Sequence, residues 1–147
     1  MIVKQRLPAK PASLRLARHA TTDALAQAGV VDHDLLAAIA LAVTETFGNA
    51  VRHAYPDALG DVDLMVECDA TQISVTVADT GVGINRPPRD PGLGLGVQLI
   101  GDLTNAWTVD SDGTGTTVCL RFDMNPNPAP PSPEHAVDVH GDPETPV

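Results

Sequence analysis

The segment that decides the fold runs from Asp32 to Tyr55 and reads DHDLLAAIALAVTETFGNAVRHAY. It predicts one long α-helix, because Asp32 can cap the first turn and Pro56 ends it. The opposite sides of this helix differ. One carries a polar cluster, and the other an apolar stripe about 100° wide: the cluster is Glu45, Asn49, Arg52 and His53, and the stripe is Leu36, Ile39, Ala40, Val43, Phe47, Ala50 and Ala54. Taken alone, the polar cluster is the ordinary solvated face of an amphipathic helix.

Shorter periodic segments on both sides of this helix predict the rest of the fold. A strand over residues 2–7 precedes a helix over residues 12–28, which Ser13 caps and Gly29 ends. After the central helix we expect strands at 62–68 and 72–78, a glycine-rich loop at 81–96, a short helix at 97–103, and a hairpin of strands 106–109 and 116–122 turning across 110–113. This order predicts an α+β two-layer sandwich, with a mixed or antiparallel sheet covered by helices on one face.

Composition bounds the class of protein. A chain of 147 residues has room for one domain, and with 43% hydrophobic but 3% aromatic residues its core must be aliphatic. The formal net charge of −10 argues against a nucleic-acid partner, which needs clustered basic residues. Residues 125–147 are Pro-rich and acidic and lack periodicity, so we expect a disordered tail behind a domain covering residues 1–124.

The start of the chain is basic, with no acidic residue before position 19: Lys4, Arg6, Lys10, Arg15 and Arg18. Such a run is either a solvated face or part of a partner surface. Cys68 and Cys119 each lie in an apolar strand-like run, which predicts two buried, reduced thiols. We expect no membrane span and no signal segment, and therefore a soluble cytoplasmic protein without a membrane partner.

Glycine-rich segments follow the predicted strands. Asp79 ends a strand just before Gly81 and Gly83, so its carboxylate can accept a hydrogen bond from an exocyclic amine while the glycines let a flat base approach. Residues 92–96 read Gly-Leu-Gly-Leu-Gly and run into a helix start, which suits phosphates but is weak evidence alone. Residues 113–118, Gly-Thr-Gly-Thr-Thr-Val, are equally compatible with plain hairpin chemistry.

Together and in this order, these segments resemble the four nucleotide-binding boxes of the GHKL ATPase superfamily. Residues 45–55 look like the N box, and residues 79–83, 92–96 and 115–118 look like the three glycine boxes. The resemblance covers nearly all of residues 1–124 and implies the Bergerat ATP-binding fold, with ATP and Mg²⁺ as cofactors.

Within the superfamily, the short chain and the ending Asn-Ala-x-x-His-Ala-Tyr resemble the anti-sigma-factor serine kinases of the RsbW and SpoIIAB type. A histidine kinase would need a helical phosphoacceptor segment ahead of the ATP domain. The resemblance implies a homodimer with two protein partners, a sigma factor and an anti-sigma antagonist of the STAS type. It also implies transfer of the ATP γ-phosphate to a serine of the antagonist.

The resemblance implies a role for each matched position. Asn49 would hold Mg²⁺, and Glu45 would be the general base on the serine hydroxyl. Asp79 would bind the adenine amine, and Thr116 would close the adenine side. The pocket and the phosphate cradle would be shaped by Gly81, Gly83, Gly92, Gly94, Leu95 and Gly96. For Arg52 and His53 a capping or salt-bridging function is expected instead of catalysis.

One departure from the pattern bears on catalysis. Residues 84–91, where a phosphate-covering lid belongs, are few, and Asp90 and Pro91 occupy the flank where an arginine is expected, with Arg86 and Arg89 nearby. Since phosphoryl transfer depends on positioning and charge neutralisation, two alternatives stay open. One is a nucleotide-gated binding module that transfers no phosphate, and the other is a free-standing ATP-binding partner in another phosphorelay.

Overall fold

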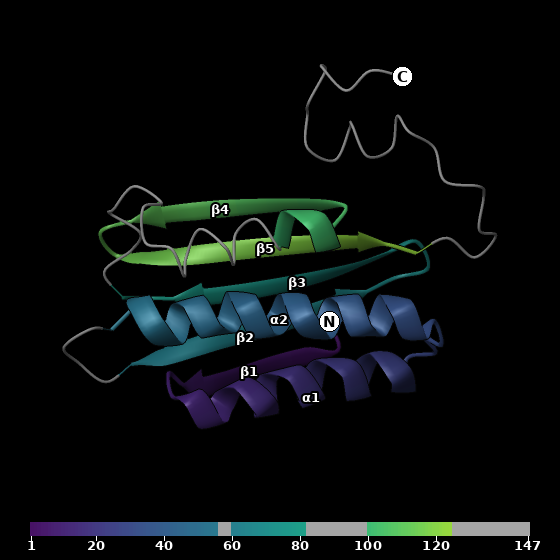
Figure 1. The fold of residues 1–147 in the computed structure, drawn as a ribbon, viewed down its shortest axis with the longest axis horizontal. Coiled ribbons are helices and arrows are strands. Elements are labelled where there is room, and N and C mark those ends of the chain that lie inside the picture. The colour runs from purple at the N-terminus through teal and green to yellow at the C-terminus, as the bar shows by residue number, and fades with distance from the viewer. Residues whose placement is uncertain (56–59, 82–99, 125–147) are drawn as a thin grey trace, which may run out of the picture.

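The computed structural model describes residues 1–55, 60–81 and 100–124. Their strands form a five-stranded sheet in the order β1-β2-β3-β5-β4, in which every neighbouring pair is antiparallel (Figure 1). The elements are β1 (Val3–Pro8), α1 (Pro11–Gln27), α2 (His33–His53), β2 (Asp61–Cys68), β3 (Gln72–Asp79), β4 (Ala106–Asp112) and β5 (Gly115–Asp123). Residues 100–103 are also helical. The predicted α+β class and element order are confirmed.

Both long helices lie on the same face of the sheet, so the domain has two layers (Figure 1). The strands alternate accordingly: in β2 and β3 every second residue is buried beneath the helices. The core between the layers is almost entirely aliphatic, as the composition predicts, and its largest side chains are Phe47, Phe122, Leu25, Ile39, Leu64, Ile73, Leu120 and Val43. The two long helices do not cover the other face of the sheet, to which the outward-facing residues of the strands point (Figure 1).

Helix α2 is the central element of the helical layer, since it packs on β2, β3 and α1. Its buried surface is therefore wider than the predicted stripe and includes Ala42, Thr46 and Gly48. Leu36 and Ala40, which the helical wheel placed in the stripe, are half-buried. The helical wheel identifies the side of α2 that faces the sheet. It does not identify the side that faces α1, because that contact depends on a segment elsewhere in the sequence.

Helix α2 is also long and apolar enough to cross a membrane, by length and composition alone. From the sequence we expect no membrane span, whereas this helix meets the length and composition of one. In the fold, Ile39, Val43 and Phe47 are fully buried in the core of the domain. Helix α2 is apolar because it is the core helix of the domain.

The two helix starts differ in how they are capped. The Asp32 carboxylate accepts from the N–H groups of Asp34 at 3.0 Å and Leu35 at 3.2 Å, as predicted. The predicted cap at Ser13 is wrong: α1 begins at Pro11, and its N-cap Lys10 makes no side-chain capping bond. Proline suits the first helical position because its missing N–H needs no partner there.

The last hairpin is tighter than predicted. Strand β4 continues through Asp112 and β5 starts at Gly115, so the turn lies at residues 113–114 and not across 110–113. Asp112 Oδ1 accepts from the N–H of Thr114 at 2.7 Å and closes the turn. The predicted burial of both thiols is also wrong: Cys68 is half-buried and Cys119 is exposed, and both are free cysteines. Cys119 occupies an outward position of β5.

The predicted glycine-rich loop beyond Gly81, the start of the short helix and the tail at 125–147 lie outside the described residues.

Candidate functional site

Asp79 is the last residue of β3 and lies where three strands are held in register. It pairs with Val62 of β2 on one side and with Thr116 of β5 on the other. Because side chains alternate along a strand and Val75 and Val77 are buried beneath the helices, Asp79 belongs to the same helix-covered face. Thr116 lies directly beside it and is itself buried. The sheet thus brings two of the predicted site residues together.

The Asp79 carboxylate is half-buried and held by backbone donors. The N–H of Gly81 donates to Asp79 Oδ1 at 2.9 Å. Desolvation by burial raises the pKa of Asp79, while the backbone N–H groups of Gly81 and Thr116 act in the opposite direction by favouring the ionised form. A carboxylate in partly desolvated surroundings attracts a hydrogen-bond donor more strongly than one in water. The geometry thus leaves Asp79 able to accept a hydrogen bond from a ligand N–H group.

Gly81 joins this strand end to the end of α2. A Cβ atom on Gly81 would overlap the backbone carbonyl of Ala54, the C-cap residue of the helix. Only glycine permits such a close approach of two backbones. The contact fixes Asp79 relative to the helix that carries Glu45 and Asn49.

A second glycine makes a similar contact from the other side. Gly115, at the start of β5, has a φ of 154°, and a Cβ atom there would overlap the carbonyl oxygen of Asp79. Next to it, the hydroxyls of Thr116 and Ser111 lie 2.9 Å apart and tie β5 to β4. Gly115 thus has a packing reason to be glycine, independent of any ligand.

The polar residues of α2 precede the contact with Gly81. At 1.5 Å per residue, Asn49 lies roughly 7.5 Å and Glu45 roughly 13.5 Å along the helix axis before Ala54. Both side chains are half-buried. Arg52 Nη2 donates to Asn49 Oδ1 at 2.8 Å, across the i, i+3 spacing that places two residues on one helix face. This hydrogen bond to a neutral amide is neither the capping nor the salt-bridging contact expected for Arg52.

The donor set of this region fits a hard cation held jointly with phosphates. No cluster of three or more His, Cys, Asp or Glu side chains that could hold a metal ion occurs among the residues that the structure describes. The amide oxygen of Asn49 is a ligand of the type that Mg²⁺ accepts when phosphate and water complete its shell. That oxygen accepts from Arg52 here, and an amide oxygen has a second lone pair.

The remaining predicted site residues lie outside the described residues: Gly83, Gly92, Gly94, Leu95 and Gly96. The segment 84–91, with Arg86 and Arg89, lies outside them as well.

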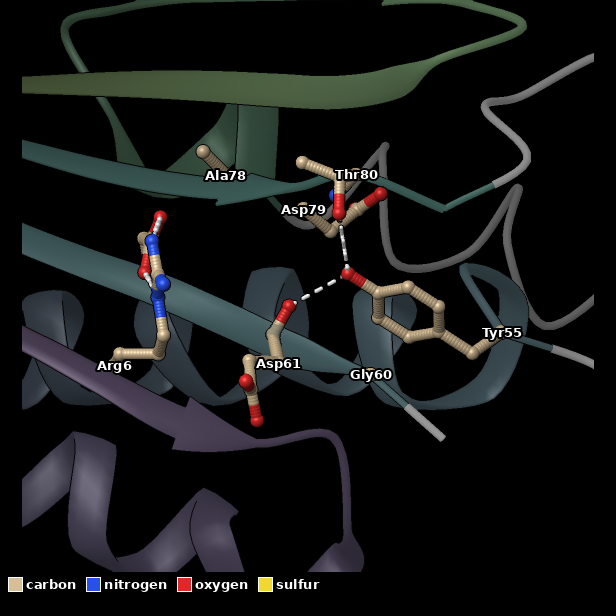
Figure 2. Close-up of a pocket in the computed structure, with 8 residues that line it drawn as sticks. Arg6, Tyr55, Gly60, Asp61, Ala78, Asp79 and Thr80 are labelled. Carbon is tan, nitrogen blue, oxygen red and sulfur yellow. Dashed lines mark hydrogen bonds and ion pairs between the residues drawn. The ribbon is translucent and has the colours of Figure 1, made fainter. Parts of the chain in front are cut away.

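Sequence reasoning missed the part played by Tyr55, which follows α2. Its hydroxyl donates to the carbonyl of Asp61 at 2.7 Å and accepts from the N–H of Thr80 at 3.0 Å (Figure 2). The three residues line a cavity of about 310 Å³ together with Arg6 and Asp63, which form an ion pair at 2.8 Å, and with Asp79. The only signal in the sequence is that a tyrosine hydroxyl near a turn needs polar partners.

Comparison with known proteins identifies the family of the chain. Residues 7–122 match the family described as histidine kinase-like ATPase domain. The sensor histidine kinase PdtaS of Mycobacterium tuberculosis is 32% identical over 102 residues, which cover 63% of this chain and 20% of PdtaS. The chain therefore spans about a fifth of the length of the curated relatives that it matches.

Two solved structures share the fold. The histidine kinase domain of a blue-light activated histidine kinase from Erythrobacter litoralis aligns with a TM-score of 0.50 and 31% identity, over 60% of this chain and 47% of that one. The RsbU and RsbW domains of a Mycobacterium tuberculosis protein align with a TM-score of 0.57 and 21% identity, over 84% of this chain and 33% of that one.

The contact between Gly81 and Ala54 predicts a large cost for the smallest substitution. Gly81→Ala should lower the free energy of unfolding by about 1–3 kcal/mol, because its methyl group must displace backbone. The control is Gly113→Ala, where a Cβ atom meets nothing within 4 Å, and a change within about 0.5 kcal/mol is expected. Urea denaturation measures both. Equal stability of the two variants would contradict the close approach.

Asp79→Asn should be at least as stable as the unliganded wild type at neutral pH. A raised pKa means that Asp79 stabilises the fold most below its ordinary value of 3.8 and loses that contribution as the pH rises through the folded-state pKa. Asparagine keeps an acceptor for Gly81 N–H and has no charge to desolvate. Melting temperatures from about pH 4.5 to 8 should therefore show the advantage of Asp79→Asn growing with pH.

The matched control for this experiment is Asp110→Asn, because Asp110 is an exposed carboxylate on β4. An Asp79→Asn variant that loses stability relative to the wild type as the pH rises would show that the charge of Asp79 stabilises the fold.

Proposed function

The chain belongs to the family of histidine kinase-like ATPase domains, and on this premise we propose that it is a Mg²⁺-ATP-dependent serine kinase that also sequesters a sigma factor. Membership of an ATPase family implies ATP binding. The finer proposal is that the γ-phosphate passes to a serine of an anti-sigma antagonist of the STAS type, which releases the sigma factor, inside the cell.

The observation that carries the ATP site is the convergence of three segments at one end of the sheet. Asp79 ends β3, Thr116 pairs with it from β5, and Gly81 packs on the end of α2. A nucleotide whose adenine amine donates to Asp79 would have its phosphates along α2, toward Asn49. Gly83, Gly92, Gly94, Leu95 and Gly96 are proposed to complete the pocket and the phosphate cradle.

The proposed chemistry gives each α2 residue one task. Bound Mg²⁺ would neutralise charge on the phosphates, and the Asn49 amide oxygen would hold it there. The Glu45 carboxylate would accept the proton of the serine hydroxyl while the serine oxygen forms its bond to the γ-phosphorus. The bond from that phosphorus to the β,γ-bridging oxygen breaks, and ADP leaves with the electron pair.

Two observations support the anti-sigma branch over other kinases. The N box ends in Asn-Ala-x-x-His-Ala-Tyr. In addition, 84% of the chain aligns with a solved structure that contains an RsbW domain. A second candidate is favoured by the matches to sensor histidine kinases, one of them at 32% identity. In that case the chain would be the ATP-binding partner of a phosphorelay, and its acceptor would be histidine.

Variants of α2 separate a kinase from a nucleotide-gated binder. Glu45→Ala should keep ATP affinity within a few-fold but lose about 10²–10⁴-fold of the phosphorylation rate, since a general base acts mainly in the transition state. Asn49→Ala should lose ATP affinity as well. The measurements are calorimetric ATP binding and transfer of γ-labelled phosphate to the STAS-type antagonists of the source organism, with acid-stable phosphoserine as the product.

The control is Glu67→Ala, because Glu67 is an exposed carboxylate on β2. Wild-type protein that binds ATP and phosphorylates none of the antagonists would leave the nucleotide-gated binder. An acid-labile phosphohistidine product would favour the phosphorelay partner.

We also propose that the chain is a homodimer, and that its basic start contributes to a contact surface. Leu16 and Arg15 of α1 are both exposed, which suits a contact surface. Arg6, by contrast, is neutralised by Asp63 within the chain. Light scattering at micromolar concentration should give twice the monomer mass of 15.3 kDa. A monomer under these conditions would remove the homodimer from the account.

A further inference from the structure

The Tyr55 hydroxyl joins two strand ends that no ladder bond connects at this position. It donates its one proton to the carbonyl of Asp61, at the start of β2, and accepts from the N–H of Thr80, just past the end of β3 (Figure 2). The Thr80 hydroxyl also lies 3.3 Å from it. The tyrosine ring packs directly on Gly60, where a Cβ atom would overlap ring carbons. Ring and hydroxyl are thus fixed together.

Thr80 stands between the two residues that define the adenine-binding end of the site. Asp79 precedes it, and Gly81 follows it and donates to Asp79 Oδ1 at 2.9 Å. Gly81 is in turn pressed on Ala54, the neighbour of Tyr55 in sequence. The tripeptide from Asp79 to Gly81 is therefore held at its middle by the Tyr55 hydroxyl and at its end by Ala54.

The strand ladder does not supply this restraint. The registers of β3 with β2 and with β5 both end at Asp79. Beyond that point the position of Thr80 depends on Tyr55. Thr80 is exposed and lines the cavity of about 310 Å³ beside Tyr55, so water can reach its N–H if the hydroxyl is removed. The Tyr55 hydroxyl therefore contributes more to the orientation of the Thr80 backbone than to the stability of the fold.

We propose that the Tyr55 hydroxyl is a positioning group that sets the selectivity of the site for a purine with a 6-amino group. The inference rests on the proposed function, in which the Asp79 carboxylate accepts from that amine. A hydrogen bond to a carboxylate selects its donor only while the carboxylate direction is fixed. By holding Thr80, Tyr55 fixes the backbone from which Asp79 projects and the N–H of Gly81 that orients its Oδ1.

The test compares two ligands that differ in one amine: ADP and purine riboside 5′-diphosphate, each with Mg²⁺, measured by calorimetry. Wild-type protein should prefer ADP by about 10- to 100-fold, the value of one charge-assisted hydrogen bond. Tyr55→Phe keeps the ring on Gly60 and removes only the hydroxyl. It should reduce the preference to about 3-fold or less by weakening ADP alone, while the analogue binds as it does to the wild type.

Two further variants complete the experiment. Gly60→Ala retains the hydroxyl but displaces the ring, so it should lose the preference by an independent route. Thr76→Val removes a hydroxyl from the outward side of the same strand, which contacts Cys119, and should keep the wild-type preference. Circular dichroism melting confirms that each variant is folded before its affinities are compared.

The outcomes separate this inference from the function beneath it. Equal weakening of both ligands in Tyr55→Phe, or an unchanged preference in a folded Tyr55→Phe, would overturn the positioning role and leave the adenine anchor intact. A wild type that binds both ligands equally would overturn the adenine anchor itself, and the positioning role with it.

Discussion

The arrangement of this domain depends on the close approach of two backbones, that of Gly81 after β3 and that of Ala54 at the end of α2. A helix and a strand end normally keep the distance that side chains impose between layers. Here glycine removes that distance, so the end of the sheet and the end of the helix become one surface. Asp79, two residues before the contact, is thereby held close to the end of α2. The other restraints, the contact of Gly115 with Asp79 and the bonds of Tyr55, act around this point.

The same constraint explains the balance between stability and function at Asp79. Burial raises its pKa, so an ionised Asp79 is less favourable in the fold than in the unfolded chain. The backbone donors offset part of this cost by favouring the ionised form. A charged acceptor in a partly desolvated position is typical of a recognition site, where a ligand donor supplies a hydrogen bond that the protein itself does not make.

Most of the fold could be predicted from the sequence because its signals are local. The cap at Asp32, the alternation in β2 and β3 and the glycines after them are read within a few residues of each other. The errors occur where a distant contact decides. Gly48 is buried against Leu14 of α1, and Cys119 is exposed because the outer face of the sheet has no long helix over it. The N-cap of α1 is Lys10 and not Ser13, because Pro11 fits the first helical position. The site followed the same rule: Asp79, Thr116 and Asn49 belong to recognisable motifs, whereas the part of Tyr55 depends on Asp61 and Thr80, which only the folded sheet brings near.

The central claim is that nucleotide binds where β3, β5 and the end of α2 meet. Titration of ¹⁵N-labelled protein with Mg-ADP, followed by amide NMR shifts, tests it most directly. The account predicts the largest saturable shifts, among the residues described, at Asn49, Thr80, Gly81 and Thr116, with small ones at the opposite end of the sheet around the turn from Asp69 to Gln72, where Asp69 closes its own turn. Largest shifts around that turn, or no saturable shift at Gly81 and Thr116, would contradict it.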